Sequence, residues 1–502
     1  MLTKEKKSFF KTENIFLIII ILFILAVAFQ LPSDPDMGWH LKNGEYLINH
    51  HWQVPSHDIY SYTMSDFPLV MHEWLTDIIM FFLYQHFGLI SLMILFTFVT
   101  SFAFFLVART VKSQIYYQLI ASLLGAIASL PIISVRSQMI TLLGLAMIIY
   151  LVYQYKARPT YRSIYLLPLI FLLWVNLHGG FSVGLLFIAL FIGVEFIKIF
   201  IKKVIKIKFI FKLNYTIFKI RDLFKLVILF FVSCLATLIN PYQLRIYYEV
   251  ITTAFDTYAK GYIGEWLPLT LDNPMSYRFI VYAIFMAFLI LFSIKKIDFT
   301  YLVISLVFFF ISISSWRHMP FFILISIPYW VYLVEYLTAD KLLQIIRKKW
   351  LIAILIIVFI IFIGQKINFF IPVINSQEVL AKTFGYPYQA VQYLKSHPPA
   401  GLMFNEYNWG GYLIWQYPEK KVFIDGRMPS WRLKHPNGET QEILKDFRII
   451  RDVQEGWDLL LLKYQIGFVL LYRDAPLGWI LEKKGWQKLY EDDLAIILEK
   501  PD

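Results

Sequence analysis

The chain has 502 residues, of which 58% are hydrophobic and only 16% are charged. So little charge excludes a soluble protein of this length, and repeated apolar runs indicate a polytopic membrane protein. The net charge of +12 does not indicate nucleic-acid binding. Its largest basic cluster, at 198–225, lies between two apolar runs, where a cytoplasmic membrane surface is expected. Cys234 is the single cysteine, so no internal disulfide can form.

The apolar runs predict an α-helical polytopic fold with about eleven transmembrane helices. They are expected near residues 15–31, 88–108, 114–133, 138–155, 163–177, 180–200, 226–240, 277–294, 298–314, 319–337 and 350–367. The first run follows a lysine-rich start but precedes no small-residue cleavage site, so we interpret it as a retained helix. Basic residues are concentrated in every second segment outside the predicted spans, beginning with the segment that precedes the first span. This pattern predicts a cytoplasmic N-terminus and an extracytoplasmic C-terminus in a multi-pass protein of the inner or plasma membrane.

The composition changes at about residue 370, where the apolar runs shorten and charged residues return. The stretches GLMFNEYNWGGYLIW (401–415), KKVFIDGRMP (420–429) and YQIGFVLLYRD (464–474) predict short strands or strand–turn units separated by helices. We therefore predict two domains. Residues 1–369 form a transmembrane domain with a first outer loop at 32–87, and residues 370–502 form a small extracytoplasmic α/β domain.

The first outer loop opens with the polar sequence LPSDPDMGWH, directly after an apolar run. Ser33 or Asp34 is expected to cap a helix whose first turn contains Pro35. Asp36 and His40 are four residues apart, so they lie on one face of that helix. The sequence HEWLTDIIMFFLYQHFG at 72–88 predicts a second helix. We expect the two helices to lie on the membrane surface as a shelf.

A carboxylate at this position can act as a general base that takes a proton from an acceptor hydroxyl or amine. Asp36 is the preferred candidate because His40, His72 and Glu73 are also titratable, whereas Asp34 is equally suited to be a helix cap. Asp, His and Glu side chains could also converge on a divalent cation, although no motif with metal-ligand spacing fixes such a site. The remaining histidines of the loop are interpreted as surface residues: His50, His51 and His57.

Four further polar residues are placed at the outer ends of predicted spans, where ionisable groups are costly and tend to mark function. They are Arg136, His178, Arg317 and His318. Arg317 is the strongest candidate, because it lies between Trp316 and His318 at the end of an apolar helix. The alternative to a functional role, for either arginine, is that its long side chain only extends its charged group to the membrane surface. The glycines after His178 are expected to form a tight turn.

These features together resemble a known group of membrane enzymes. The segments that carry the resemblance are DPDMGWHLKNGEYLINHHWQVPSHDIYSYT (34–63), FPLVMHEWLTDII (67–79), LLWVNLHGGFSVGLL (172–186), NWGGYLIW (408–415) and KVFIDGR (421–427). They are similar to bacterial proteins of the GT-C glycosyltransferase superfamily, which includes protein O-mannosyltransferases and aminoarabinose transferases. The resemblance implies a polyprenyl-phosphate-linked sugar donor, an extracytoplasmic acceptor (glycan, lipid or protein) and inversion at the anomeric carbon. It implies that Asp36, or Asp34 beside it, is the catalytic base.

An anionic lipid donor would need cationic partners at the outer membrane boundary, and the two arginines and two histidines named above are the candidates. Three other functions share parts of this pattern. A transporter or flippase would bind the same lipid phosphate, but it is expected to carry ionisable residues near the bilayer midplane. A polymerase or ligase of surface polysaccharide would use the same carrier. A sensor or scaffold would not need so polar a first loop.

Overall fold

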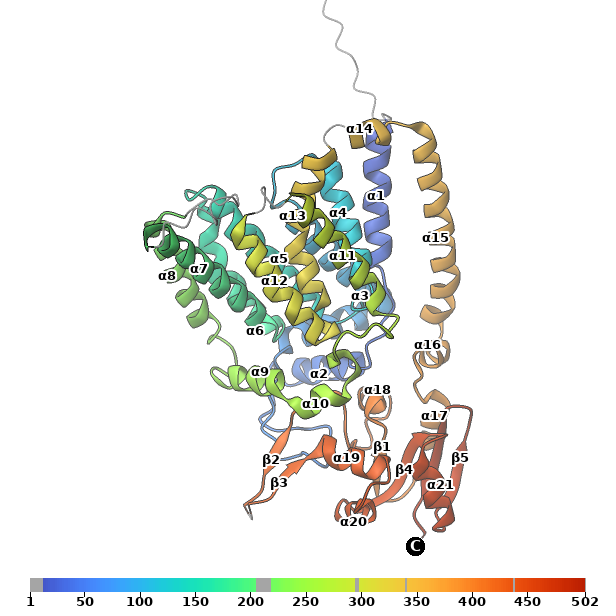
Figure 1. The fold of residues 1–502 in the computed structure, drawn as a ribbon. Coiled ribbons are helices and arrows are strands. Elements are labelled where there is room, and N and C mark those ends of the chain that lie inside the picture. Colours follow the sequence, from blue (N-terminus) through green and yellow to red (C-terminus); the bar gives the residue numbers. More distant parts are fainter. Residues whose placement is uncertain (1–11, 205–217, 294–297, 339–340, 437, 502) are drawn as a thin grey trace, which may run out of the picture. The chain divides into compact units, whose positions relative to one another are not determined.

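The computed structural model describes residues 12–204, 218–293, 298–338, 341–436 and 438–501, and most of them are helical (Figure 1). The basic residues at 4–11 and 295–296, and much of the cluster at 198–225, lie outside the described residues. The chain divides into two compact units. The first unit comprises Met1–Leu31, Met93–Asn240 and Tyr262–Asn368. The second unit comprises Pro32–Leu92, Pro241–Gly261 and Phe369–Asp502.

The first unit is built from apolar helices. They are α1 (Thr12–Ala28), the second part of α3 (Trp74–Ala108), α4 (Ile115–Ala128), α5 (Gln138–Ala157), η1 (Arg162–Leu166), α6 (Leu167–Leu177), α7 (Phe181–Val204), α8 (Ile220–Ala236), η3 (Gly264–Trp266), α11 (Ser276–Ser293), α12 (Phe299–Ser314), η5 (Trp316–His318), α13 (Met319–Thr338), α14 (Lys341–Ile346) and most of α15 (Lys349–Asn375). Each predicted span falls on one of these helices. Among the described residues, 6 helices are long and apolar enough to cross a membrane. The number that do so stays a prediction.

Helix α3 contains the boundary that the sequence predicts between a surface helix and a span. Gly88 interrupts it with φ 69° and ψ −170°, which is a left-handed conformation that glycine adopts without steric cost. The helical residues before Gly88 belong to the predicted segment 72–88, and those after it to the predicted span 88–108. The second helix of the first outer loop is therefore confirmed, and its position on a membrane surface stays a prediction.

The second unit combines helices with two small sheets. Its helices are α2 (Met37–Asn49), the first part of α3, α9 (Arg245–Phe255), α10 (Thr257–Tyr262), α16 (Gln377–Phe384), α17 (Tyr388–Ser396), η6 (Tyr407–Trp409), α18 (Gly410–Gln416), α19 (Ile443–Arg451), α20 (Trp457–Lys463) and α21 (Pro476–Lys483). Its strands are β1 (Leu402–Asn405), β2 (Arg432–Lys434), β3 (Thr440–Glu442), β4 (Ile466–Tyr472), β5 (Gln487–Glu491) and β6 (Ala495–Glu499).

The larger sheet has the strand order β1-β4-β6-β5, and the other two strands form a separate hairpin. β1 runs parallel to β4, with Phe404 opposite Val469, whereas β6 runs antiparallel to both β4 and β5. The sequence IGFVLLY of β4 has side chains buried on both faces, as expected for a central strand. The predicted α/β character is present. The prediction of short strands or strand–turn units over 401–415 is confirmed at β1 but is wrong for its last residues, where α18 forms and buries Leu413 and Ile414.

The first outer loop packs with the C-terminal residues in this unit. Trp39 of α2 is buried in the same hydrophobic core as Trp409, Leu413 and Phe468. Farther along the loop, Val422 donates its N–H to the carbonyl of Tyr60 at 3.0 Å. The predicted domain boundary stays a prediction, and the structure adds that residues 32–92 and 369–502 share one compact unit.

Gly44 of α2 offers a direct test of this packing. A Cβ at Gly44 would overlap the backbone oxygen of Asp77 and would lie 2.5 Å from Phe81 Cβ in α3. Because neither the backbone nor a Cβ can swing aside, we expect Gly44→Ala to cost about 2 kcal/mol and to lower Tm by about 5 °C or more. The control is Gly478→Ala, whose Cβ would meet only Ile496 Cγ2 at 3.7 Å. Equal melting of the two variants in lipid nanodiscs would contradict the packing described.

Candidate active site

The two aspartates of the opening motif have different surroundings. Asp34 is 6% exposed, and its Oδ1 accepts a hydrogen bond from the N–H of Asp36 at 3.0 Å. It therefore forms the turn that precedes α2. Asp36 occupies the N-cap position of α2, yet its side chain makes no capping hydrogen bond. The helix thus begins two residues later than a cap at Asp34 would require. Its N-terminus favours a negative charge at Asp36.

The carboxylate of Asp36 lies against a glycine of the C-terminal residues. An ideal Cβ at Gly426 would overlap Asp36 Oδ1 and would lie 2.9 Å from Asp36 Cγ. The backbone N–H of His40 bonds to the carbonyl of Asp36 at 3.2 Å, so the two residues are one helical turn apart as predicted. The candidate base therefore sits at the start of α2, in contact with the turn of the sequence IDGR.

His40 is buried between two carboxylates. Its Nδ1 lies 2.6 Å from Asp77 Oδ1 and its Nε2 lies 3.3 Å from Glu73 Oε2. Asn43 donates to the other oxygen of Asp77 at 3.0 Å. Burial disfavours the imidazolium, but the charges of Asp77 and Glu73 outweigh it and raise the pKa of His40 to about 9. His40 is therefore a buried cation at neutral pH.

The same cluster has the ligand types of a metal site. One ligand atom each from His40, Glu73 and Asp77 lie within 4.8 Å of one another. Two ligands on one cation, each about 2.1 Å from it, are separated by roughly 3 Å or more. The 2.6 Å between His40 and Asp77 is instead the distance of a hydrogen bond. The observed geometry is thus that of a protonated cluster, and a cation would have to open the His40–Asp77 pair.

His72, the other predicted residue of this segment, lies at the edge of the cluster. Its Nε2 is 3.5 Å from Glu73 Oε1, and its side chain is 37% exposed. Glu73 therefore contacts both His40 and His72. Asp77 was missed by the sequence analysis, although its spacing of four residues from Glu73 on a predicted helix was the signal that could have found it.

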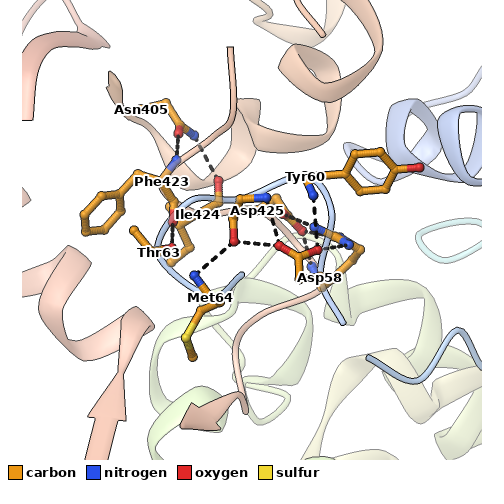
Figure 2. Close-up of polar contacts among 10 residues, drawn as sticks. Asp58, Tyr60, Thr63, Met64, Asn405, Phe423, Ile424 and Asp425 are labelled. Atoms are coloured by element: carbon orange, nitrogen blue, oxygen red, sulfur yellow. Dashed lines mark hydrogen bonds and ion pairs between the residues drawn. The ribbon is translucent and has the colours of Figure 1, made fainter. Parts of the chain in front are cut away.

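A buried ion cluster holds the IDGR turn in place (Figure 2). Arg427 donates from Nε and Nη2 to the two oxygens of Asp425 at 2.8 and 2.7 Å, and from Nη1 to Asp58 Oδ1 at 2.8 Å. Both aspartates are nearly inaccessible to solvent. Their charges and the hydrogen bonds outweigh burial and raise the pKa of Arg427. Asp425 and Arg427 thus pair with each other, and Asp58 is the third member of the cluster.

Asp58 and its neighbours also bind the backbone next to this turn. Asp58 Oδ2 accepts from the N–H and the hydroxyl of Ser61 at 2.8 and 2.6 Å. Thr63 donates to the carbonyl of Phe423 at 2.6 Å, and Asn405 bonds to both Phe423 and Ile424 (Figure 2). The polar residues of this part of the loop therefore have a structural role.

In the first unit, two of the predicted residues share one carboxylate. Arg136 is 7% exposed and makes two hydrogen bonds to Glu265, at 2.8 and 3.0 Å. Arg317 Nη1 lies 3.9 Å from the same carboxylate, and its guanidinium lies 5.8 Å from the ring centroid of Trp266. Burial raises the pKa of Glu265, but the charges of Arg136 and Arg317 lower it below its usual value. Two guanidinium groups thus face one carboxylate.

The two histidines of this unit lie in turns. His178 Nδ1 accepts a hydrogen bond from the N–H of Gly180 at 2.9 Å and lies 2.7 Å from Thr141 Oγ1. A Cβ at Gly180 would overlap Thr141 Oγ1, so the expected tight turn is present. His318 ends η5, and its carbonyl accepts a hydrogen bond from Ser312 at 2.9 Å. These hydrogen bonds fix the two turns.

Comparison with known proteins finds a solved structure of similar fold. No protein-family model and no curated protein sequence matches the chain. Among solved structures, the chain is similar to the archaeal oligosaccharyltransferase AglB from Archaeoglobus fulgidus, in complex with an inhibitory peptide and a dolichol-phosphate. The TM-score is 0.53 at 11% sequence identity, over 91% of this chain and 69% of that chain. The chain therefore shares its overall fold with this oligosaccharyltransferase, which agrees in outline with the predicted GT-C-like fold.

The charge on His40 predicts a dependence of stability on pH. Its pKa is about 9 in the folded chain and about 6.5 when unfolded, so the charged cluster stabilises the fold fully below pH 6.5. This contribution, on the order of 3 kcal/mol, declines as pH rises and is lost above about pH 9. We expect the wild-type Tm to fall between pH 6 and 9.5 by several degrees more than that of His40→Gln.

The control for this comparison is His57→Gln, because His57 is exposed in the same loop. It should follow the wild type at every pH. Parallel curves for wild type and His40→Gln would contradict a buried imidazolium. A rise in wild-type Tm on addition of Mn²⁺ or Zn²⁺, absent in Asp77→Asn, would show that a cation replaces the proton in this cluster.

Proposed function

We propose that this protein is a glycosyltransferase that moves a sugar from a polyprenyl-phosphate carrier to an extracytoplasmic glycan, lipid or protein. Asp36 is the general base. The observation that carries the proposal is the position of Asp36 at the start of α2, one helical turn before the buried His40. The fold it shares with a membrane oligosaccharyltransferase supports the same class of chemistry.

The reaction needs one base and one anion-binding group. The acceptor hydroxyl or amine attacks the anomeric carbon, the bond from that carbon to the phosphate oxygen breaks, and polyprenyl phosphate leaves with the bonding electrons. The acceptor proton passes to Asp36, and attack from the face opposite the phosphate inverts the anomeric carbon. Asp34 is a weaker candidate for the base, because its Oδ1 already accepts the N–H of Asp36.

Arg136 and Arg317 are the proposed partners of the donor phosphate. They place two guanidinium groups beside the single carboxylate of Glu265, so this cluster carries a net positive charge. His178 and His318 are proposed to lie near the same lipid head group. His40, His72 and Glu73 are proposed to bind the sugar or to position groups that do. A divalent cation at this site is also a proposal. We further propose that the protein crosses the inner or plasma membrane several times. In this topology the N-terminus is cytoplasmic and the C-terminal domain is extracytoplasmic.

The first test measures release of labelled sugar from a panel of polyprenyl-phosphate hexoses and pentoses, with membrane extract as acceptor and purified protein in nanodiscs. We expect Asp36→Asn to lower kcat by about 100- to 10,000-fold, because the amide cannot accept the acceptor proton. We expect Asp34→Asn to lose less than about tenfold. Asp66→Asn, at an exposed position of the same loop, should match the wild type.

Each other outcome has a definite meaning. Loss only in Asp34→Asn would keep the enzyme and move its base two residues upstream. A donor that binds tightly without being consumed would favour a transporter or flippase. Consumption of a lipid-linked donor with growth of a polymer, or with transfer of a whole glycan, would favour a polymerase or ligase.

The phosphate role of Arg317 predicts a change in binding. Removing a charge-assisted hydrogen bond to the phosphate costs about 1.5–3 kcal/mol in donor and transition state alike. We therefore expect Arg317→Gln to raise KM for the donor by about 10- to 100-fold with little change in kcat. Arg278→Gln, at an exposed position of α11, is the charge-matched control. An unchanged KM in Arg317→Gln would contradict the assignment.

A further inference from the structure

The backbone on both sides of Asp36 touches glycines from residues 410–426. A Cβ at Gly411 would overlap the carbonyl oxygen of Pro35 and would lie 3.2 Å from Trp39 Cδ1. A Cβ at Gly38 would overlap the carbonyl oxygen of Gly411. Gly426 contacts the carboxylate of Asp36, and Gly411 contacts the backbone of the same turn. The opening turn of α2 therefore packs against two glycines that have no side chain to separate the segments.

The segments that contain Gly411 and Gly426 are both held in place by buried contacts. Gly411 lies in the first turn of α18, in a region whose hydrophobic core is buried. Gly426 lies between Asp425 and Arg427, which are fixed by the buried ion cluster described above. Gly410 also packs on this turn, because a Cβ there would overlap the carbonyl oxygen of Ile424. The IDGR turn cannot move without breaking a buried ion pair, and α18 cannot move without disrupting the hydrophobic core.

We propose that Gly426 is a positioning residue for the base, and that the IDGR turn and α18 fix the orientation of the Asp36 carboxylate. This inference rests on the proposed function and assigns a role in the reaction to the C-terminal residues. Any side chain at position 426 would occupy the volume of Asp36 Oδ1 and push the carboxylate into another rotamer. A displacement of about 1 Å can cost about 100-fold in rate.

The test compares Gly426→Ala with Gly478→Ala, both in the C-terminal residues, in the sugar-release assay with whichever donor of the panel the wild type consumes. Gly478 lies in α21, where a Cβ makes only an ordinary contact. We expect Gly426→Ala to lower kcat by about 100-fold with KM for the donor within about twofold of wild type. Gly478→Ala should retain wild-type kcat and KM.

A thermal double-mutant cycle shows whether the effect passes through Asp36. Asp36→Ala removes the carboxylate that the new Cβ would strike, so Gly426→Ala should lower Tm in the wild-type background and change it little in the Asp36→Ala background. A general defect of the turn would lower Tm equally in both backgrounds, and that result overturns the proposal.

Two activity results are also decisive. Wild-type turnover by Gly426→Ala, or an equal loss in Gly478→Ala, overturns the positioning role and leaves the glycosyltransferase function in place. A panel from which the wild type consumes no donor overturns the proposed function itself. The wild-type measurement therefore distinguishes the two failures.

Discussion

Burying a guanidinium group costs several kcal/mol unless carboxylates and hydrogen bonds surround it, and Arg427 meets this requirement with two aspartates. Asp425 comes from its own turn, whereas Asp58 comes from the first outer loop, 369 residues earlier. Neither segment can bury its charge alone, so the two must form together. The parallel pairing of Ser61 with Val422 and the hydrogen bond from Thr63 to Phe423 follow from this constraint. The shape of the turn that contacts Asp36 depends on the same cluster.

The dense charge of the first outer loop is divided among separate tasks. Asp34 forms a turn, Asp58 holds Arg427, and Asp77 pairs with His40. Each of these carboxylates is buried and engaged in a described hydrogen bond. Asp36 differs in its position, because it occupies the N-cap of α2 and its carboxylate contacts Gly426. The loop thus combines several structural acids with one preferred candidate for the base.

Sequence periodicity was sufficient for the helices, because each predicted span is a long apolar run and such a run has few alternatives to a helix. The interruption of α3 at Gly88 agrees with the predicted ranges, which end one helix and begin the next span at that residue. Helix α18 was not predicted, because NWGGYLIW has two glycines and the aromatic residues that are typical of a strand. Only tertiary packing decides between helix and strand for such a sequence. Asp36 and His40 were predicted from helical spacing. The contacts of Asp58 with Arg427 and of Asp36 with Gly426 join residues more than 360 positions apart, and no local pattern encodes such a pairing.

The separation between Asp58 and Arg427 in the sequence also has a consequence for folding during synthesis. A ribosome adds about 5–20 residues per second, so the 369 residues between these two partners require roughly 20 to 70 s of synthesis. Throughout that time the first outer loop exists without the charge, the strand neighbour and the core that it will later bury. The part of the loop around Asp58 therefore reaches its final contacts only after residue 427 has been made, and a chain interrupted before that residue leaves Asp58 without its buried partner.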